Sequence, residues 1–169
     1  MSLIVGVNSY VSVADADAYF AERLHSSRWE NARPAEKEKA LIMAARSLDA
    51  AFNFFGVVAD ESQKLAWPRA YVYDPEGREI PSDKIPEIIA FATCEQALYL
   101  LGTDPTSLPD LLIKGFSRTT LGKMSVETDR MNVAAMIAKF AKSLAEKLGV
   151  IVPGAGASGG IQNGQTSRA

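Results

Sequence analysis

The sequence predicts a mainly α protein: a helical bundle of about four helices with a small β-hairpin arm and a flexible C-terminal tail. Three observations support this fold class. Apolar residues recur at helical spacing in several stretches, a segment around Leu121 and Gly122 alternates polar with β-prone residues, and residues 150–169 are rich in Gly, Ser, Asn and Gln. The 169 residues, 47% of them hydrophobic, are enough for one globular core.

The first two helices are indicated by their start signals. In "SVADADAYFAERL", Ser12 is a candidate N-cap and Asp15 follows three residues later, where it can serve the first-turn amides. In "RPAEKEKALIMAARSLDAAFNFF", Pro34 takes a natural first-turn position and acidic residues follow it. We expect this second helix to end near Gly56.

A third helix is expected to begin near Pro86 and to stop at Gly102, and its wide apolar face predicts a central place. After a turn-rich connection, residues 114–128 predict the hairpin arm. The fourth helix ends at Gly149 and carries a narrow apolar stripe. The stripe consists of Val133, Ile137, Phe140, Leu144 and Leu148. Because an internal helix usually shows a wider apolar face, we expect this stripe to dock on a neighbouring subunit or partner.

The chain is expected to divide into a helical domain over residues 1–149 and a tail over residues 150–169. Arg168 is the only charge in the tail, which has too few large apolar residues to fold alone. Its first residues, Val150, Ile151 and Val152, alternate faces when extended and suit the edge of a partner's sheet. We therefore expect the tail to be disordered in the free protein and to order on a partner.

Charge is distributed unevenly along the chain. The formal net charge is -2, which argues against a basic nucleic-acid binder of the obvious kind. Residues 1–113 carry 10 basic and 17 acidic side chains, whereas residues 114–169 carry 8 basic and 3 acidic ones. The two parts therefore suit differently charged surroundings.

Residues for catalysis or for a metal site are scarce. One cysteine, Cys94, and one histidine, His25, allow neither an internal disulfide nor a zinc site of the usual ligands. The tail matches the G-x-G-x-x-G and G-x-S-x-G patterns, but it lacks the strands, helices and partner residues that these motifs need. The longest apolar helix is interrupted by Glu95 and Gln96. We expect no enzyme activity, no cofactor, no metal and no membrane span.

Two aromatic-basic pairs keep nucleic acid under consideration. Arg28 precedes Trp29, and Trp67 is followed by Pro68 and Arg69. Single-stranded nucleic acid is held by aromatic stacking in a positive groove, so these pairs are possible contacts. The other interpretation is that both tryptophans pack against the helices while the arginines cover the surface. The sequence leaves both open.

The order of several segments resembles a known family. These segments are "SYVSVADADAYF", "ALIMAARSLDAAF", "KLAWPRAYVYDPEGREIP" and "IPEIIAFATCEQALYLL". They are similar to tailed-phage and prophage proteins that are often labelled DnaT-like single-stranded-DNA-binding protein, and whose gene context and fold resemble head-tail connector (adaptor, head completion) proteins. The resemblance covers roughly residues 8–102 and extends more weakly to about 130. Its most specific parts are Trp67-Pro68-Arg69, the turn from Asp74 to Gly77, and Pro86.

The resemblance implies a structural virion protein. It implies a homo-oligomeric ring, dodecameric by analogy, in the neck of the bacteriophage between the portal protein and a tail or tail-terminator protein, with host cytoplasm as the site of assembly. Double-stranded DNA passes through such a ring without sequence specificity. Trp67 and Pro68 then serve fold and assembly. The alternative is a DnaT-like, replication-associated protein that binds single-stranded DNA through Arg28, Trp29, Trp67 and Arg69.

Overall fold

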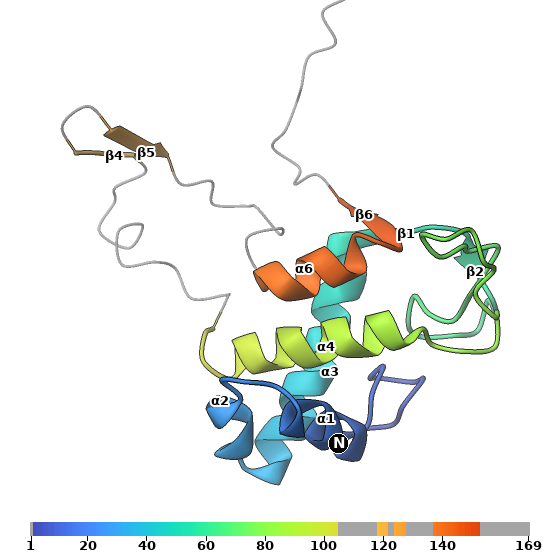
Figure 1. The fold of residues 1–169 in the computed structure, drawn as a ribbon, viewed down its shortest axis with the longest axis horizontal. Coiled ribbons are helices and arrows are strands. Elements are labelled where there is room, and N and C mark those ends of the chain that lie inside the picture. Colours follow the sequence, from blue (N-terminus) through green and yellow to red (C-terminus); the bar gives the residue numbers. More distant parts are fainter. Residues whose placement is uncertain (1, 105–117, 122–123, 128–136, 153–169) are drawn as a thin grey trace, which may run out of the picture.

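The structure, a computed structural model, describes residues 2–104, 118–121, 124–127 and 137–152 (Figure 1). The predicted mainly α class with a small hairpin is confirmed. The described helices are α1 (Val13–Ala21), α2 (Ser27–Glu30), α3 (Pro34–Ala51), α4 (Glu87–Leu100) and α6 (Lys139–Ala145). Three antiparallel strand pairs accompany them: β1 (Phe52–Phe54) with β6 (Gly149–Ile151), β2 (Val57–Val58) with β3 (Arg69–Ala70), and β4 (Arg118–Leu121) with β5 (Met124–Glu127).

The predicted helix starts are confirmed by their capping contacts. The Ser12 hydroxyl accepts a hydrogen bond from the Asp15 amide at 3.1 Å, which satisfies one first-turn donor of α1. Pro34 opens α3, and the Glu36 carboxylate accepts from the Arg33 amide at 2.9 Å. Pro86, extended at φ -61° and ψ 139°, is the N-cap of α4. These local signals therefore set where the helices begin.

The end predicted for the second helix, near Gly56, is wrong. α3 stops at Ala51, and Phe52–Phe54 form β1, with the two phenylalanines buried and Asn53 exposed. This alternation has the period of a strand, and the backbone of β1 pairs with that of β6. Pairing with a distant segment has replaced the helical continuation that the apolar spacing predicted.

α4 occupies the central place that its wide apolar face predicted, because it packs against both α3 and α6 (Figure 1). Glu95, only 3% exposed, lies within this packing. Its carboxylate accepts hydrogen bonds from the Tyr19 hydroxyl at 2.7 Å and from the Arg23 guanidinium, one of whose nitrogens lies at 2.8 Å. This ion pair, buried at Glu95, joins the segment just after α1 to the middle of α4.

The core consists of two clusters of buried side chains. One surrounds Trp67 and takes residues from α3, β1, α4 and α6, and the other surrounds Trp29 and takes residues from α1, α3 and α4. α3 and α4 contribute to both clusters. Each tryptophan is therefore a centre of one half of the core.

The apolar stripe of the last helix does not form one docking face. Ile137 and Leu148 are buried, at 5% and 1% exposure, and belong to the Trp67 cluster, against which half-buried Leu144 also packs. Phe140 is 53% exposed. Val133 lies outside the described residues. The prediction that the whole stripe docks on a partner is therefore wrong for Ile137 and Leu148. Both pack into the core of their own chain, where α6 lies against α4.

The start of the predicted tail is also corrected. Val150 and Ile151 belong to β6 and pair with Asn53 and Phe52, and the Val152 amide donates to the Ala51 carbonyl at 2.9 Å. The sheet edge that these residues suit is therefore one in their own chain, and the folded body reaches residue 152 instead of ending at 149. Residues 153–169 lie outside the described part.

The hairpin predicted over residues 114–128 is confirmed in β4 and β5, which pair from Arg118 with Glu127 to Leu121 with Met124. Within the described residues, no helix has the length and apolar character required to cross a bilayer.

Candidate functional site

The segment that carried the family resemblance lies at the base of a loop-rich lobe, which we define as residues 55–85. Trp67 is completely buried, and its ring meets the edge of Phe54 with ring centroids 5.7 Å apart. The Trp67–Pro68 peptide bond is cis. The Trp67 Nε1–H has no hydrogen-bond partner among the described residues, at an order-of-magnitude cost of about 1–3 kcal/mol. Trp67 therefore anchors the lobe in the core.

A buried polar network fixes the chain on either side of this anchor. The Tyr10 hydroxyl donates to Asp49 Oδ1, and the Ala66 amide donates to Asp49 Oδ2 at 3.1 Å. The Trp67 amide donates to the Tyr10 hydroxyl at 3.3 Å. Burial raises the pKa of the Tyr10 hydroxyl and the pKa of the Asp49 carboxyl above their usual values. The N-terminal segment, α3 and the lobe are thus held together by one network.

Arg69 ties together two parts of the lobe, the turn that follows β1 and the segment around Trp67. Its guanidinium donates to the carbonyls of Phe55 at 2.6 Å, Gly56 at 2.8 Å and Ala66 at 3.1 Å. Gly56 has φ +69°, and a Cβ built there would lie 2.2 Å from the Ala70 carbonyl oxygen. This position therefore requires glycine, and the Arg69 side chain is occupied within the fold.

The predicted turn from Asp74 to Gly77 is present and well ordered by its own contacts. The Asp74 carboxylate accepts from the amides of Glu76 and Arg78, each at 2.9 Å, and pairs with the Arg78 guanidinium at 2.8 Å. The backbone hydrogen bond from Arg78 is the largest of the effects that lower the pKa of Asp74. Gly77 takes φ +79°, which suits glycine. The turn presents its charged groups to solvent.

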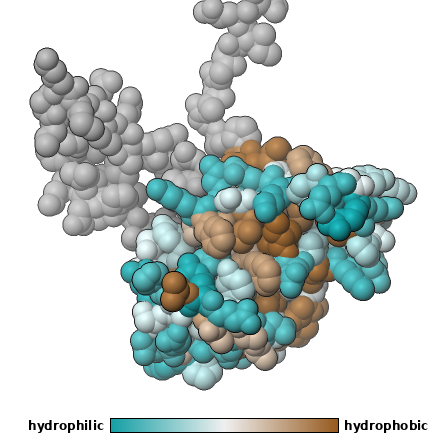
Figure 2. Space-filling model, viewed as in Figure 1, coloured by the Kyte–Doolittle hydropathy of each residue, from teal (hydrophilic) through white to brown (hydrophobic). Residues whose placement is uncertain are grey.

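Apolar side chains are exposed on the lobe around this rigid base. Tyr71 is 72% exposed, and four other large apolar residues of the lobe are also exposed. We call the five the lobe surface: Phe55, Val57, Val58, Tyr71 and Tyr73. In the view of Figure 2 the apolar side chains gather over α6 and α4, whereas the side of the molecule that carries the lobe is mainly hydrophilic, so the lobe surface is separate from the apolar area seen there. Exposed apolar groups of this kind are typical of surfaces that contact other molecules.

The two tryptophans proposed as nucleic-acid contacts both lie in the core. Trp29 is 1% exposed, and its Nε1–H donates to the Asp17 carboxylate at 2.7 Å. Lys37 lies over the same ring, 5.1 Å from its centroid. Arg28 is exposed beside Lys39 at a separate hollow. The structure therefore supports the other interpretation, that the tryptophans pack against the helices, and these rings do not form a stacking surface.

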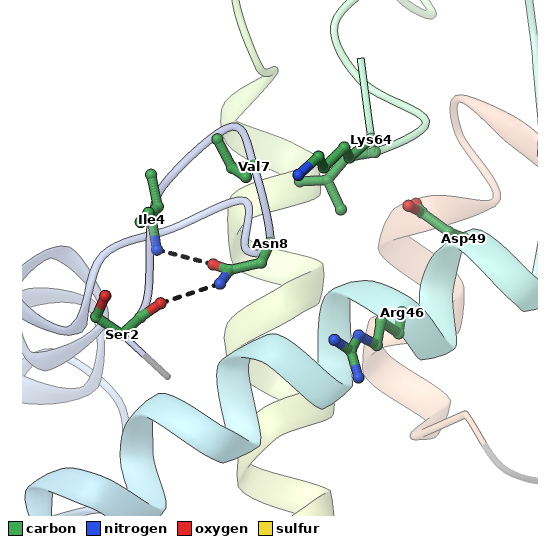
Figure 3. Close-up of a pocket in the computed structure, with 8 residues that line it drawn as sticks. Ser2, Ile4, Val7, Asn8, Arg46, Asp49 and Lys64 are labelled. Atoms are coloured by element: carbon green, nitrogen blue, oxygen red, sulfur yellow. Dashed lines mark hydrogen bonds between the residues drawn. The ribbon is translucent and has the colours of Figure 1, made fainter. Parts of the chain in front are cut away.

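A pocket that the sequence did not indicate lies between the N-terminal loop, α3 and the segment before Trp67 (Figure 3). It has a volume of about 680 Å³ and combines apolar side chains with Arg46, Lys64 and Asp49. Its residues come from three separate parts of the chain, so no local pattern could indicate it. Among the described residues, no three His, Cys, Asp or Glu side chains are grouped to hold a metal ion.

Together, the fold and the site describe a small helical protein in which the segment around Trp67 forms part of the core. A family model described as "Putative DnaT-like ssDNA binding protein" matches residues 2–161. The chain therefore belongs to this family, as the sequence resemblance predicted. The match names no connector role, so that part of the resemblance stays a prediction. No curated protein and no solved structure shows significant similarity to the chain.

Proposed function

We propose that the chain is a structural assembly protein of a tailed phage or prophage, a head-tail connector subunit. In this proposal it forms a homo-oligomeric ring, expected to be dodecameric, in the virion neck between the portal protein and a tail or tail-terminator protein. Double-stranded DNA passes through the ring without sequence-specific contacts. Assembly takes place in the host cytoplasm, and the role needs neither catalysis nor a cofactor.

The lobe surface is the observation that carries this proposal. Its apolar side chains are exposed, while Trp67, the Tyr10–Asp49 network and the Arg69 guanidinium hold the backbone beneath them. A rigid apolar surface loses little conformational entropy on binding, which favours protein association. The segments that carry the connector resemblance, Trp67-Pro68-Arg69 and the Asp74 turn, are the ones that build this surface.

The charge of the main body also supports the proposal. Residues 2–104 and 137–152, which form this body, together contain 13 basic and 17 acidic side chains. An acidic surface repels the phosphate backbone and allows DNA to slide past, whereas tight binding to single strands requires many cations against phosphates. The body is thus better suited to contact proteins than to hold nucleic acid.

A surface substitution tests the proposal. Tyr71→Asp places a charge on the lobe surface, and we expect the variant to fold normally but to be incorporated poorly into particles, as measured by quantitative mass spectrometry of purified virions. Leu24→Asp is the matched control, because Leu24 is 82% exposed and lies outside the lobe. Equal incorporation of the Tyr71 variant and the wild-type chain would argue against the lobe as an assembly surface.

Single-stranded DNA binding is a second candidate, favoured by the description of the family. The burial of Trp29 and Trp67 means that another part of the chain would have to supply the stacking groups. Anisotropy titration of labelled oligo-dT over a salt series separates the two candidates. Saturable binding, with an affinity that falls with salt as expected for contacts to several phosphates, would favour this second function. No binding at low salt would exclude it.

A further inference from the structure

The geometry points to a binding site for an acidic peptide segment in the pocket of Figure 3. We propose that this pocket takes one carboxylate side chain together with the apolar residues next to it in an extended peptide. The proposal rests on three features: a fixed apolar wall, two cations whose side chains have no partner among the described residues, and a carboxylate that is hydrogen-bonded to other groups of the fold. It deepens the proposed assembly function, because it names the chemistry of one protein partner.

The apolar wall is exposed and yet held in place. Ile4 and Val7 lie on the N-terminal loop and are 52% and 38% exposed. The Asn8 side chain fixes this loop, since its Oδ1 accepts from the Ile4 amide at 2.7 Å and its Nδ2 donates to the Ser2 carbonyl at 3.0 Å. The dashed lines in Figure 3 mark both hydrogen bonds. An apolar side chain can therefore bind beside Ile4 and Val7 without first ordering the loop.

Two cations line the same pocket and have no counter-charge. Arg46 is on α3 and Lys64 is in the lobe, and the side chain of neither makes an ion pair or hydrogen bond with any part of the chain that the structure describes. Both are exposed, so they are free to close on an anion. Charge-assisted hydrogen bonds from such groups are the strong polar contacts of protein interfaces.

The third charge in the pocket, Asp49, does not neutralise these cations by direct pairing. Its two oxygens accept from the Tyr10 hydroxyl and the Ala66 amide, and it forms no ion pair with Arg46 or Lys64 within the described residues. With Asp49 ionised, Arg46, Lys64 and Asp49 together carry one net positive charge, which matches a single carboxylate. A phosphate with two charges would be less well matched.

The absence of aromatic side chains separates a peptide from a nucleic acid. The described residues that line the pocket include Ile4, Val7 and Leu65 but no Phe, Tyr or Trp. Single-stranded nucleic acid gains much of its binding from stacking on aromatic rings. Aliphatic side chains beside two cations instead suit a carboxylate flanked by leucine-like residues.

The test uses the purified full chain and a fluorescein-labelled pentapeptide, Ser-Leu-Asp-Leu-Ser, followed by anisotropy. We expect saturable binding, and binding at least about tenfold weaker for the same peptide with asparagine in place of aspartate. Arg46→Gln and Lys64→Gln should each weaken binding about tenfold. Lys84→Gln is the control, since Lys84 is exposed and is not among the residues that line the pocket; it should leave binding unchanged. Because all three side chains are exposed, we expect all three variants to keep the wild-type melting temperature.

Three results would overturn the inference. One is equal affinity for the aspartate and asparagine peptides, and another is peptide binding that does not change in Arg46→Gln and Lys64→Gln. The third is displacement of the peptide by oligo-dT with the same dependence on Arg46, which would assign the pocket to nucleic-acid phosphates. Peptide binding is measured without particles, so its failure is distinct from a failure of particle incorporation.

Discussion

The hydroxyl of Tyr10 donates a hydrogen bond to the carboxylate of Asp49, 39 residues further along the chain. Asp49 also accepts from the amide of Ala66, and the Tyr10 oxygen accepts from the amide of Trp67. Through this pair the N-terminal segment and α3 together define where Trp67 enters the core. The lobe surface and the pocket of Figure 3 both depend on this relationship.

Removal of the Tyr10 hydroxyl should therefore destabilise the whole body. In Tyr10→Phe, the partly buried Asp49 loses a hydrogen-bond donor, and we expect a loss of about 1–3 kcal/mol in the free energy of unfolding. Urea denaturation measures the loss. Tyr73→Phe is the control, because Tyr73 is exposed, and its unfolding midpoint should stay at the wild-type value. An unchanged midpoint for Tyr10→Phe would contradict the importance of the network.

Stability should fall in alkaline solution. Burial raises the pKa of Tyr10 above 10.0 and raises the pKa of the Cys94 thiol from 9.0 to about 12. Above pH 9 to 10 the unfolded chain releases these protons while the folded chain retains them, so the free energy of unfolding decreases as pH rises. Thermal melting between pH 8 and 11 measures this decrease. Tyr10→Phe should show a shallower decrease, and parallel curves for the two proteins would rule out the contribution of Tyr10.

The ion pair between Arg23 and Glu95 should matter more than those on the surface. In Arg23→Ala, the Glu95 carboxylate stays buried and keeps the hydrogen bond from the Tyr19 hydroxyl, but it loses its charged partner. We expect a loss of about 3 kcal/mol in the free energy of unfolding. Arg33→Ala removes an exposed pair with Glu36 and should barely change the melting temperature. A similar loss of stability in both variants would show that the pair buried at Glu95 contributes no more to stability than the exposed pair.

Truncation distinguishes the folded body from the tail. A chain ending at Val152 keeps the pairing of β6 with β1, whereas a chain ending at Gly149 loses the pairing of Val150 and Ile151 and the hydrogen bond from the Val152 amide. We expect the shorter chain to melt several degrees lower and the longer one to melt close to the full-length protein. Equal melting temperatures for both truncated chains would mean that β6 contributes little to stability.

Local signals explain what the sequence could predict. Ser12, Pro34 and Pro86 act on the turn in which they lie, so the starts of α1, α3 and α4 follow from a few neighbouring residues. The central place of α4 follows in the same way from its broad apolar face. The hairpin of β4 and β5 is also local, because its two strands are close neighbours in sequence.

The features that could not be predicted depend on distant segments. The pairing of Phe52 with Ile151 joins segments about 100 residues apart in the sequence, and it ends α3 early and draws the predicted tail into the body. The same packing buries Ile137 and Leu148 while Phe140 stays exposed. In the sequence Arg46 and Lys64 look like ordinary surface cations, and only the fold brings them to one pocket.

The central claim is that this chain is an assembly subunit built into the particle. Its most direct test is the copy number of the chain relative to the portal protein in purified mature particles of the phage or prophage that encodes it, measured by mass spectrometry with isotope-labelled peptide standards. The proposed connector predicts a fixed ratio close to one chain per portal subunit. Absence of the chain from mature particles that contain the portal protein would contradict the claim.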